Sequence, residues 1–154
     1  PVLKRAFLFS CLTGLRKSDI QKLTWGEVQK FGKYTRIVFK QRKTKGQEYL
    51  DISSQAEKYL GERGNPDDIV FTGFTYGSWT SLELQRWSLA AGVNKNLTFH
   101  CARHTFAVLM LDLGADIYTV SKLLGHRFLT TTQIYAKVLD KNKQNAVSLI
   151  PDIG

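Results

Sequence analysis

The sequence has little cysteine, few acidic residues and no long apolar run. Its two cysteines, Cys11 and Cys101, both lie in apolar helical contexts. We therefore predict buried, reduced thiols rather than a disulfide. No apolar run approaches the roughly 20 residues that span a bilayer, and the first residues show no secretory pattern. These absences predict a cytoplasmic protein with no membrane partner.

Basic residues outnumber acidic ones. The chain has 22 Lys and Arg against 13 Asp and Glu, a formal net charge of +9. This excess favours a polyanion as the partner. A length of 154 residues suits a single domain with its own core. Because the sequence starts within a helical pattern and not at a methionine, we expect a fragment of a longer protein.

Hydrophobic periodicity predicts a mainly α fold with a small antiparallel β-sheet or hairpin, the α+β class. Period-two alternation marks strands over 34–41 and 48–52, joined by a turn. Caps and glycines mark the helix ends. The predicted helices run from Leu3 to Gly14, from a capping box at Ser18 to Leu23, from Ser53 to Gly61, from a capping box at Thr80 to Gly92 with Leu84, Trp87 and Ala91 buried, and from about Asp116 to Gly125.

The turn of the predicted hairpin carries three cations, Arg42, Lys43 and Lys45. Such cations either protect the edge of a sheet from pairing with another chain or reach into a nucleic-acid groove. Both interpretations fit an exposed ribbon.

A further helix is predicted around residues 99–113. Its core stripe at 100° per residue is Ala102, Phe106, Leu109 and Leu113. His100, Arg103 and His104 fall together on the opposite side of the same helix. A cation and two imidazoles are therefore expected on a face that the core does not need.

Other candidates lie in turns and at helix ends. Arg16 precedes a short helix whose N-terminus favours anions. His126 follows the glycine that ends the helix before it, and a capping box of Thr130 and Gln133 predicts another helix, from which Tyr135 projects sideways. The apolar patch at 146–150 is either a last turn of the core or a docking element for another subunit.

Five short motifs occur together over about residues 3–140. They are Thr13-Gly14-Leu15-Arg16-Lys17-Ser18-Asp19, Lys43-Thr44, His100-x-x-Arg103-His104, Leu124-Gly125-His126, and Tyr135 nine residues after His126. In order and spacing they resemble the catalytic domain of tyrosine recombinases, the phage-integrase family. Cys101 and Ala102 stand where that family often has Asp and Leu.

The resemblance implies a role for each matching residue. Tyr135 is the nucleophile, Arg16 and Arg103 hold the scissile phosphate, and His100 and His126 complete the site.

Further roles follow from the same resemblance. Lys43 is the general acid, and Arg42 and Lys45 contact DNA. Asp19 and His104 support the catalytic residues from a second layer around the site.

The residue types also suit phosphodiester transfer on chemical grounds. Guanidinium groups bind phosphate oxygens in a bidentate manner that lysine cannot reproduce. A phenol with a pKa near 10 needs a base, for which a neutral imidazole such as His100 is suited. Lys43 can supply the proton that a departing 5′-oxygen needs. The arginines take the electrostatic role of a metal, so no metal or cofactor is required.

Three alternatives stay open. The spacing of His100 and His104 lets both bind one zinc ion from a helix, with Cys101 or His126 as a third ligand. A recombinase-like scaffold can also serve as a non-catalytic DNA-binding module. A type IB topoisomerase uses similar chemistry to relax supercoils.

The resemblance also implies partners. These are double-stranded DNA and, in the full-length protein, other recombinase subunits that form a tetramer on paired sites, with DNA-binding domains upstream of this chain. The implied setting is integration or excision of a mobile element in the bacterial cytoplasm or nucleoid.

Overall fold

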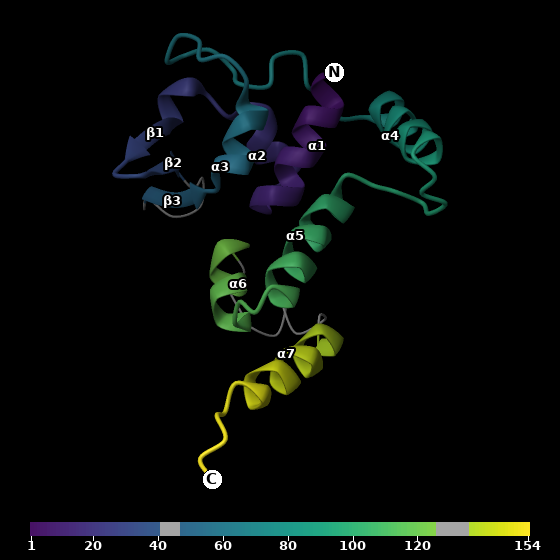
Figure 1. The fold of residues 1–154 in the computed structure, drawn as a ribbon. Coiled ribbons are helices and arrows are strands. Elements are labelled where there is room, and N and C mark those ends of the chain that lie inside the picture. Colours follow the sequence, from purple (N-terminus) through teal and green to yellow (C-terminus); the bar gives the residue numbers. More distant parts are fainter. Residues whose placement is uncertain (41–46, 126–135) are drawn as a thin grey trace.

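Helix α1 lies at the centre of the fold, with the sheet on one side of it, α4 on the other and α5 beneath (Figure 1). The computed structural model describes residues 1–40, 47–125 and 136–154. The elements in chain order are α1 (Val2–Thr13), α2 (Lys17–Lys22), η1 (Trp25–Glu27), β1 (Val28–Phe31), β2 (Tyr34–Lys40), β3 (Gln47–Ile52), α3 (Ser54–Glu57), η2 (Lys58–Leu60), α4 (Ser78–Ala90), α5 (His100–Asp112), α6 (Ile117–Leu123) and α7 (Ala136–Ser148). Helices around a small antiparallel sheet confirm the predicted α+β class.

Helix α1 ends where the sequence predicted. Gly14 adopts φ 75°, and its N–H donates to the Ser10 carbonyl as the C-cap. A Cβ at Gly14 would lie 2.6 Å from Cδ1 of Phe106. Both the positive φ and this close approach require glycine, so the turn after α1 can lie directly against α5.

The three strands form one antiparallel sheet in the order β1-β2-β3. The register pairs Arg36 with Asp51 and Ile37 with Leu50, which confirms the predicted pairing of the second and third strands. Ile37 and Leu50 are buried on the inner face. Their alternation with exposed residues is the period-two signal that the sequence showed.

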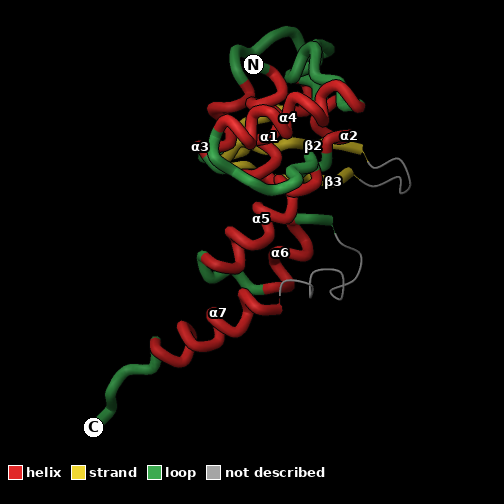
Figure 2. The backbone as a smooth tube through the Cα atoms, turned by 90° about the vertical axis from the view of Figure 1, so that its right-hand side faces the viewer, coloured by secondary structure: helices red, strands yellow, loops and turns green. Residues whose placement is uncertain are grey.

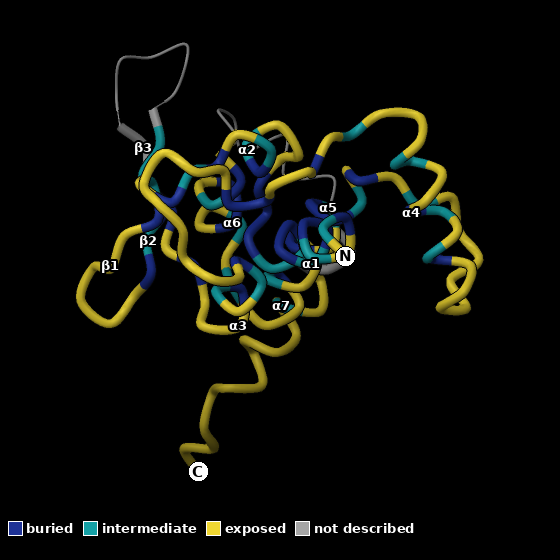
Figure 3. Tube along the Cα trace, turned by 90° about the horizontal axis from the view of Figure 1, so that it is seen from above, coloured by how far each residue is buried: buried dark blue, intermediate teal, exposed yellow. Residues whose placement is uncertain are grey.

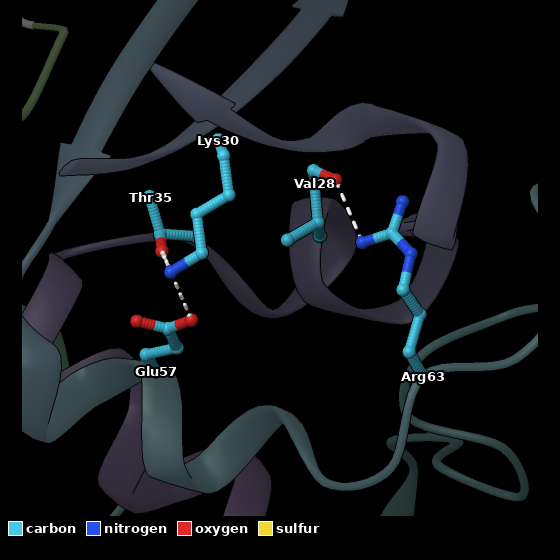
Figure 4. A network of polar contacts seen from close by, with 5 residues as sticks. All are labelled: Val28, Lys30, Thr35, Glu57 and Arg63. Carbon is cyan, nitrogen blue, oxygen red and sulfur yellow. Dashed lines mark hydrogen bonds and ion pairs between the residues drawn. The ribbon is translucent and has the colours of Figure 1, made fainter. Parts of the chain in front are cut away.

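Strand β1 was not predicted, because Val28 is its one buried residue and Lys30, on the same face, is exposed. Lys30 Nζ donates to Thr35 Oγ1 at 2.9 Å and to Glu57 Oε1 at 2.8 Å. Arg63 donates to the Val28 carbonyl at 2.9 Å (Figure 4). All five residues line a cleft of about 520 Å³. Their bonds connect β1 to β2, to the end of α3 and to the segment after η2.

Helix α5 packs against α1, α6 and α7. Ala102 and Phe106 are buried as predicted, but Leu109 and Leu113 are exposed, so that part of the predicted stripe is wrong. The remaining buried residues of α5 are Arg103, Ala107 and Leu111. Several neighbouring helices bury a wider stripe of α5 than the single face that a helical wheel predicts.

Two helix starts differ from the predicted capping boxes. Helix α2 begins at Lys17 with Arg16 as its N-cap, so Ser18 lies inside the helix. Helix α4 begins at Ser78, and Thr80 Oγ1 accepts from the Gly77 N–H at 2.7 Å. A Ser/Thr-x-x-Glu/Gln pattern therefore did not locate either start.

Helix α4 lies to one side of the core and is largely exposed (Figure 3). Leu84 is fully buried and Trp87 is half-buried, but Ala91 is exposed. The predicted buried edge is thus right for Leu84 and wrong for Ala91.

Helix α7 and the C-terminal segment extend away from the rest of the molecule (Figure 2). An ion pair of 2.8 Å between Lys141 and Asp112 links α7 to α5. Val147, Leu149 and Ile150 are exposed, so this patch is not a last turn of the core. Nowhere in the described part of the chain is a helix long and apolar enough to cross a membrane.

Candidate active site

The turn between α1 and α2 presents Arg16. Leu15 is buried, its N–H donates to Thr13 Oγ1, and Ser10 Oγ donates to the Leu15 carbonyl at 2.7 Å. Arg16 follows in an extended conformation, φ −72° and ψ 154°, and is exposed. Arg16 is thus an exposed residue that directly follows a fixed one.

Arg103 lies on α5 and is buried, with 7% of its surface exposed. Its Nη1 donates to the Gly14 carbonyl at 2.8 Å, and its Nη2 donates to the Leu124 carbonyl. The predicted placement of Arg103 on a face that the core does not need is therefore wrong. The helix wheel missed this because main-chain carbonyls at the ends of two other helices meet α5 there.

These two bonds of Arg103 connect the predicted motifs. Gly14 lies two residues before Arg16, and Leu124 lies two residues before His126. Arg103 thus holds together the turn that carries Arg16 and the segment that leads to His126, although neither is near it in sequence.

His100 and His104 share one face of α5, as predicted. Their ring centroids lie 4.7 Å apart with the planes at 86°. The pKa of His100 lies below its usual value, first because of partial burial and then because of the neighbouring His104, Arg103, Arg16 and Lys17. His100 is therefore a neutral imidazole at pH 7, able to accept a proton.

The electrostatics of His100 reveal a residue that the sequence reasoning passed over. Lys17 faces His100 from α2 and lies over the ring of Tyr76, with Nζ 4.6 Å from the ring centroid. The only sequence signal was its position directly after Arg16. Tyr76 showed no signal, because it belongs to a loop far away in the chain.

Asp19 makes an ion pair within its own helix. One carboxylate oxygen lies 3.7 Å from Nζ of Lys22. The carboxylate thus lies on α2, three residues after Arg16, and its support of the site stays a prediction.

Five predicted site residues lie outside the described residues. These are Arg42, Lys43, Lys45, His126 and Tyr135. The described chain reaches the ends of these segments, because β2 ends at Lys40, β3 begins at Gln47 and α7 begins at Ala136.

The two cysteines are free and half-buried, not fully buried as predicted. Burial, with a smaller contribution from Cys101, raises the pKa of Cys11 to about 11. Cys11 is therefore a protonated, weakly reactive thiol at neutral pH.

The zinc interpretation needs a third ligand beside His100 and His104. Within residues 1–40, 47–125 and 136–154, no three metal-ligating side chains gather. Cys101 therefore does not complete a site with the two histidines, and His126 lies outside this part of the chain.

The fold is that of a known class of protein, the integrase catalytic domains. The catalytic domain of bacteriophage HP1 integrase has this fold, with a TM-score of 0.62 over 97% of this chain and 89% of that chain at 22% identity. The XerH site-specific recombinase, in a post-cleavage complex with palindromic difH substrate, has a TM-score of 0.70 over 96% of this chain and 45% of that chain at 20% identity.

The chain belongs to the phage integrase family, whose family model matches residues 2–142. It is 33% identical over 140 residues to tyrosine recombinase XerD of Oceanobacillus iheyensis, covering 82% of this chain and 46% of the relative. It is 34% identical over 134 residues to tyrosine recombinase XerC of Actinobacillus pleuropneumoniae, covering 80% of this chain and 43% of the relative. The predicted family is thus confirmed, and the chain spans about half the length of these curated relatives.

Proposed function

We propose that this chain is the catalytic domain of a tyrosine-type site-specific recombinase. It cleaves and rejoins DNA through a covalent 3′-phosphotyrosyl intermediate on Tyr135. The observation that carries the proposal is the position of Arg103, which is bonded both to the turn that presents Arg16 and to the end of α6 before His126. Three separate motifs thereby meet beside His100.

The chemistry follows from the groups that meet there. Tyr135 attacks the scissile phosphate, and the bond to the 5′-oxygen breaks as the new bond to the phenol oxygen forms. Arg16 and Arg103 offset the negative charge of the non-bridging oxygens. His100 is neutral and receives the phenol proton, and Lys43 donates a proton to the departing 5′-oxygen.

The remaining candidates support this reaction from around it. His126 completes the phosphate contacts, while Asp19 and His104 support the site from behind. Arg42 and Lys45 bind the DNA backbone next to Lys43, as expected for cations on an exposed ribbon.

The substrate in this proposal is double-stranded DNA. The net charge of +9 favours it, and the structurally similar Tn1549 transposon integrase is in complex with circular intermediate DNA. The full-length protein would add upstream DNA-binding domains and act as a tetramer on paired sites in the bacterial cytoplasm. Within this proposal the reaction serves the integration or excision of a mobile element.

The test captures covalent adducts from a pool of nicked duplexes with randomised sequence around the nick. The nick lets the short 5′-hydroxyl strand diffuse away, so cleaved DNA remains on the protein under denaturing conditions. Wild type should yield adducts of a defined sequence, and Tyr135→Phe should yield none. The matched control is Tyr118→Phe, whose ring is exposed on α6. An adduct that persists in Tyr135→Phe would contradict the proposed nucleophile.

The same assay decides between arginine and metal electrostatics. Cleavage should proceed in excess EDTA, because Arg16 and Arg103 supply the positive charge. If EDTA stops cleavage and zinc restores it, the result would favour a zinc site at His100 and His104 over charge stabilisation by the two arginines.

A further inference from the structure

Tyr76 lies in the loop before α4 and touches both elements that carry the candidate site. Its hydroxyl accepts a hydrogen bond from the Phe99 N–H at 3.2 Å. Its ring packs edge-on against that of Phe99, with centroids 5.4 Å apart. Lys17 lies over the same ring, with Nζ 4.6 Å from the centroid. One half-buried side chain therefore contacts α2 and the start of α5.

The positions of these contacts relate Tyr76 to the site. Phe99 is the N-cap of α5, and His100 is the first residue of that helix. Lys17 is the first residue of α2 and follows Arg16, the N-cap. Tyr76 thus connects the residue before His100 with the residue after Arg16.

The loop that carries Tyr76 is itself anchored in the core. Phe74 is buried, and its ring centroid lies 5.4 Å from that of Phe99. Phe7 of α1 meets Phe99 from another side, with centroids 5.7 Å apart. Because these aromatic contacts fix the loop, the hydroxyl and ring of Tyr76 can act as fixed points for α5 and Lys17.

We propose that Tyr76 is a positioning residue of the active site, whose hydroxyl fixes the first turn of α5 at His100 and whose ring holds Lys17 beside the phosphate-binding Arg16. This inference rests on the proposed recombinase function. Nothing in the motifs pointed to Tyr76, because its role depends on the packing of a distant loop.

The electrostatics of His100 give this inference a readout apart from activity. The charged and titratable groups that face His100 are Arg16 and Lys17 from α2, and Arg103 and His104 from its own helix. Each lowers the pKa of His100. Without the ring of Tyr76, Lys17 is no longer held near His100, so the pKa of His100 should rise.

The experiment measures the pKa of His100 by NMR of the imidazole nitrogens and the rate of adduct formation at saturating DNA. Tyr76→Leu and Lys17→Gln should each raise the pKa of His100, and the double variant should raise it no further than Lys17→Gln alone. Tyr76→Phe keeps the ring but loses the hydroxyl. It should leave that pKa in place and slow cleavage roughly five- to tenfold, the effect of one neutral hydrogen bond.

Tyr118 offers a matched control on α6, because Lys122 lies over its ring at 5.3 Å in the same manner. Tyr118→Leu should change neither the pKa of His100 nor the cleavage rate. A general effect of removing an exposed tyrosine–lysine pair would appear in this variant as well.

Three outcomes would overturn the inference. The first is an unchanged His100 pKa in Tyr76→Leu. The second is a wild-type cleavage rate in Tyr76→Phe. The third is a loss of cleavage in Tyr76→Phe that disappears on cooling while the His100 pKa stays unchanged, because such a loss marks a purely structural role. If wild type forms no adduct, the proposed function fails, while the pKa measurements still decide whether Tyr76 holds Lys17 beside His100.

Discussion

Replacement of Arg103 should weaken the fold as well as the reaction. The Arg103 side chain is buried and donates to main-chain carbonyls at Gly14 and Leu124, at the ends of α1 and α6. Arg16, by contrast, is exposed at the N-cap of α2. The two arginines have similar roles in the proposed chemistry, but only Arg103 also holds helices together.

The size of the effect follows from the two bonds. A hydrogen bond to a charged group contributes about 1.5–3 kcal/mol, and a buried carbonyl that loses its donor costs a similar amount. Lysine can reach one of the two carbonyls, so Arg103→Lys should lower the free energy of unfolding by about 2 kcal/mol. For a domain of this size that is a fall in Tm of about 4–8 °C. Arg103→Met loses both bonds and should cost about 3–5 kcal/mol.

The assay is urea and thermal unfolding followed by circular dichroism, without DNA. Arg16→Lys is the matched control and should change the free energy of unfolding by less than about 0.5 kcal/mol, as is usual for an exposed residue. Both lysine variants should lose adduct formation, because an ammonium does not reproduce bidentate phosphate binding.

Two results would refute this reasoning. One is a wild-type free energy of unfolding in Arg103→Met, because the two bonds would then contribute nothing. The other is an equal destabilisation by Arg16→Lys, because burial would then not distinguish the two arginines.

Three further predictions concern single groups. Lys43→Ala should cleave roughly 10²–10⁴-fold more slowly. A substrate with a bridging 5′-sulfur, which leaves without a proton, should restore most of the rate of Lys43→Ala. If this substrate rescues Lys45→Ala and not Lys43→Ala, the general acid is Lys45. The pKa of His100 lies below its usual 6.5, so the imidazole stays mostly neutral as the pH falls to 6.5. The loss of cleavage on the acid side should therefore have its midpoint below pH 6.5. A midpoint above 6.5 would contradict His100 as the base. In wild type at pH 8, with peptide mass spectrometry reading Cys11 alone, Cys11 with its pKa of about 11 should react with iodoacetamide about two hundredfold more slowly than the same thiol in denatured protein. Equal rates would show that its surroundings do not protect it.

Local signals in the sequence were enough for the hairpin and for the end of α1. The residues of β2 alternate because one face of the sheet is buried, and that alternation predicted the pairing of β2 with β3. Gly14 predicted the end of α1 because the left-handed conformation there is costly for other residues. The motifs around Arg16, Arg103 and His126 predicted the family, since their order and spacing can be read along the chain.

Only the tertiary structure decided the surroundings of Arg103, Lys30 and Tyr76. A helical wheel describes one helix against a single neighbour, whereas α5 packs against α1, α6 and α7. Arg103 is therefore buried and Leu109 is exposed. Lys30 lies on the same face of β1 as the buried Val28, where Glu57, 27 residues further along the chain, pairs with it. The contacts of Tyr76 with Lys17 and Phe99 likewise join segments that are far apart in sequence. Periodicity records the local geometry of the backbone, while these three side chains are placed by partners that only the folded chain brings near.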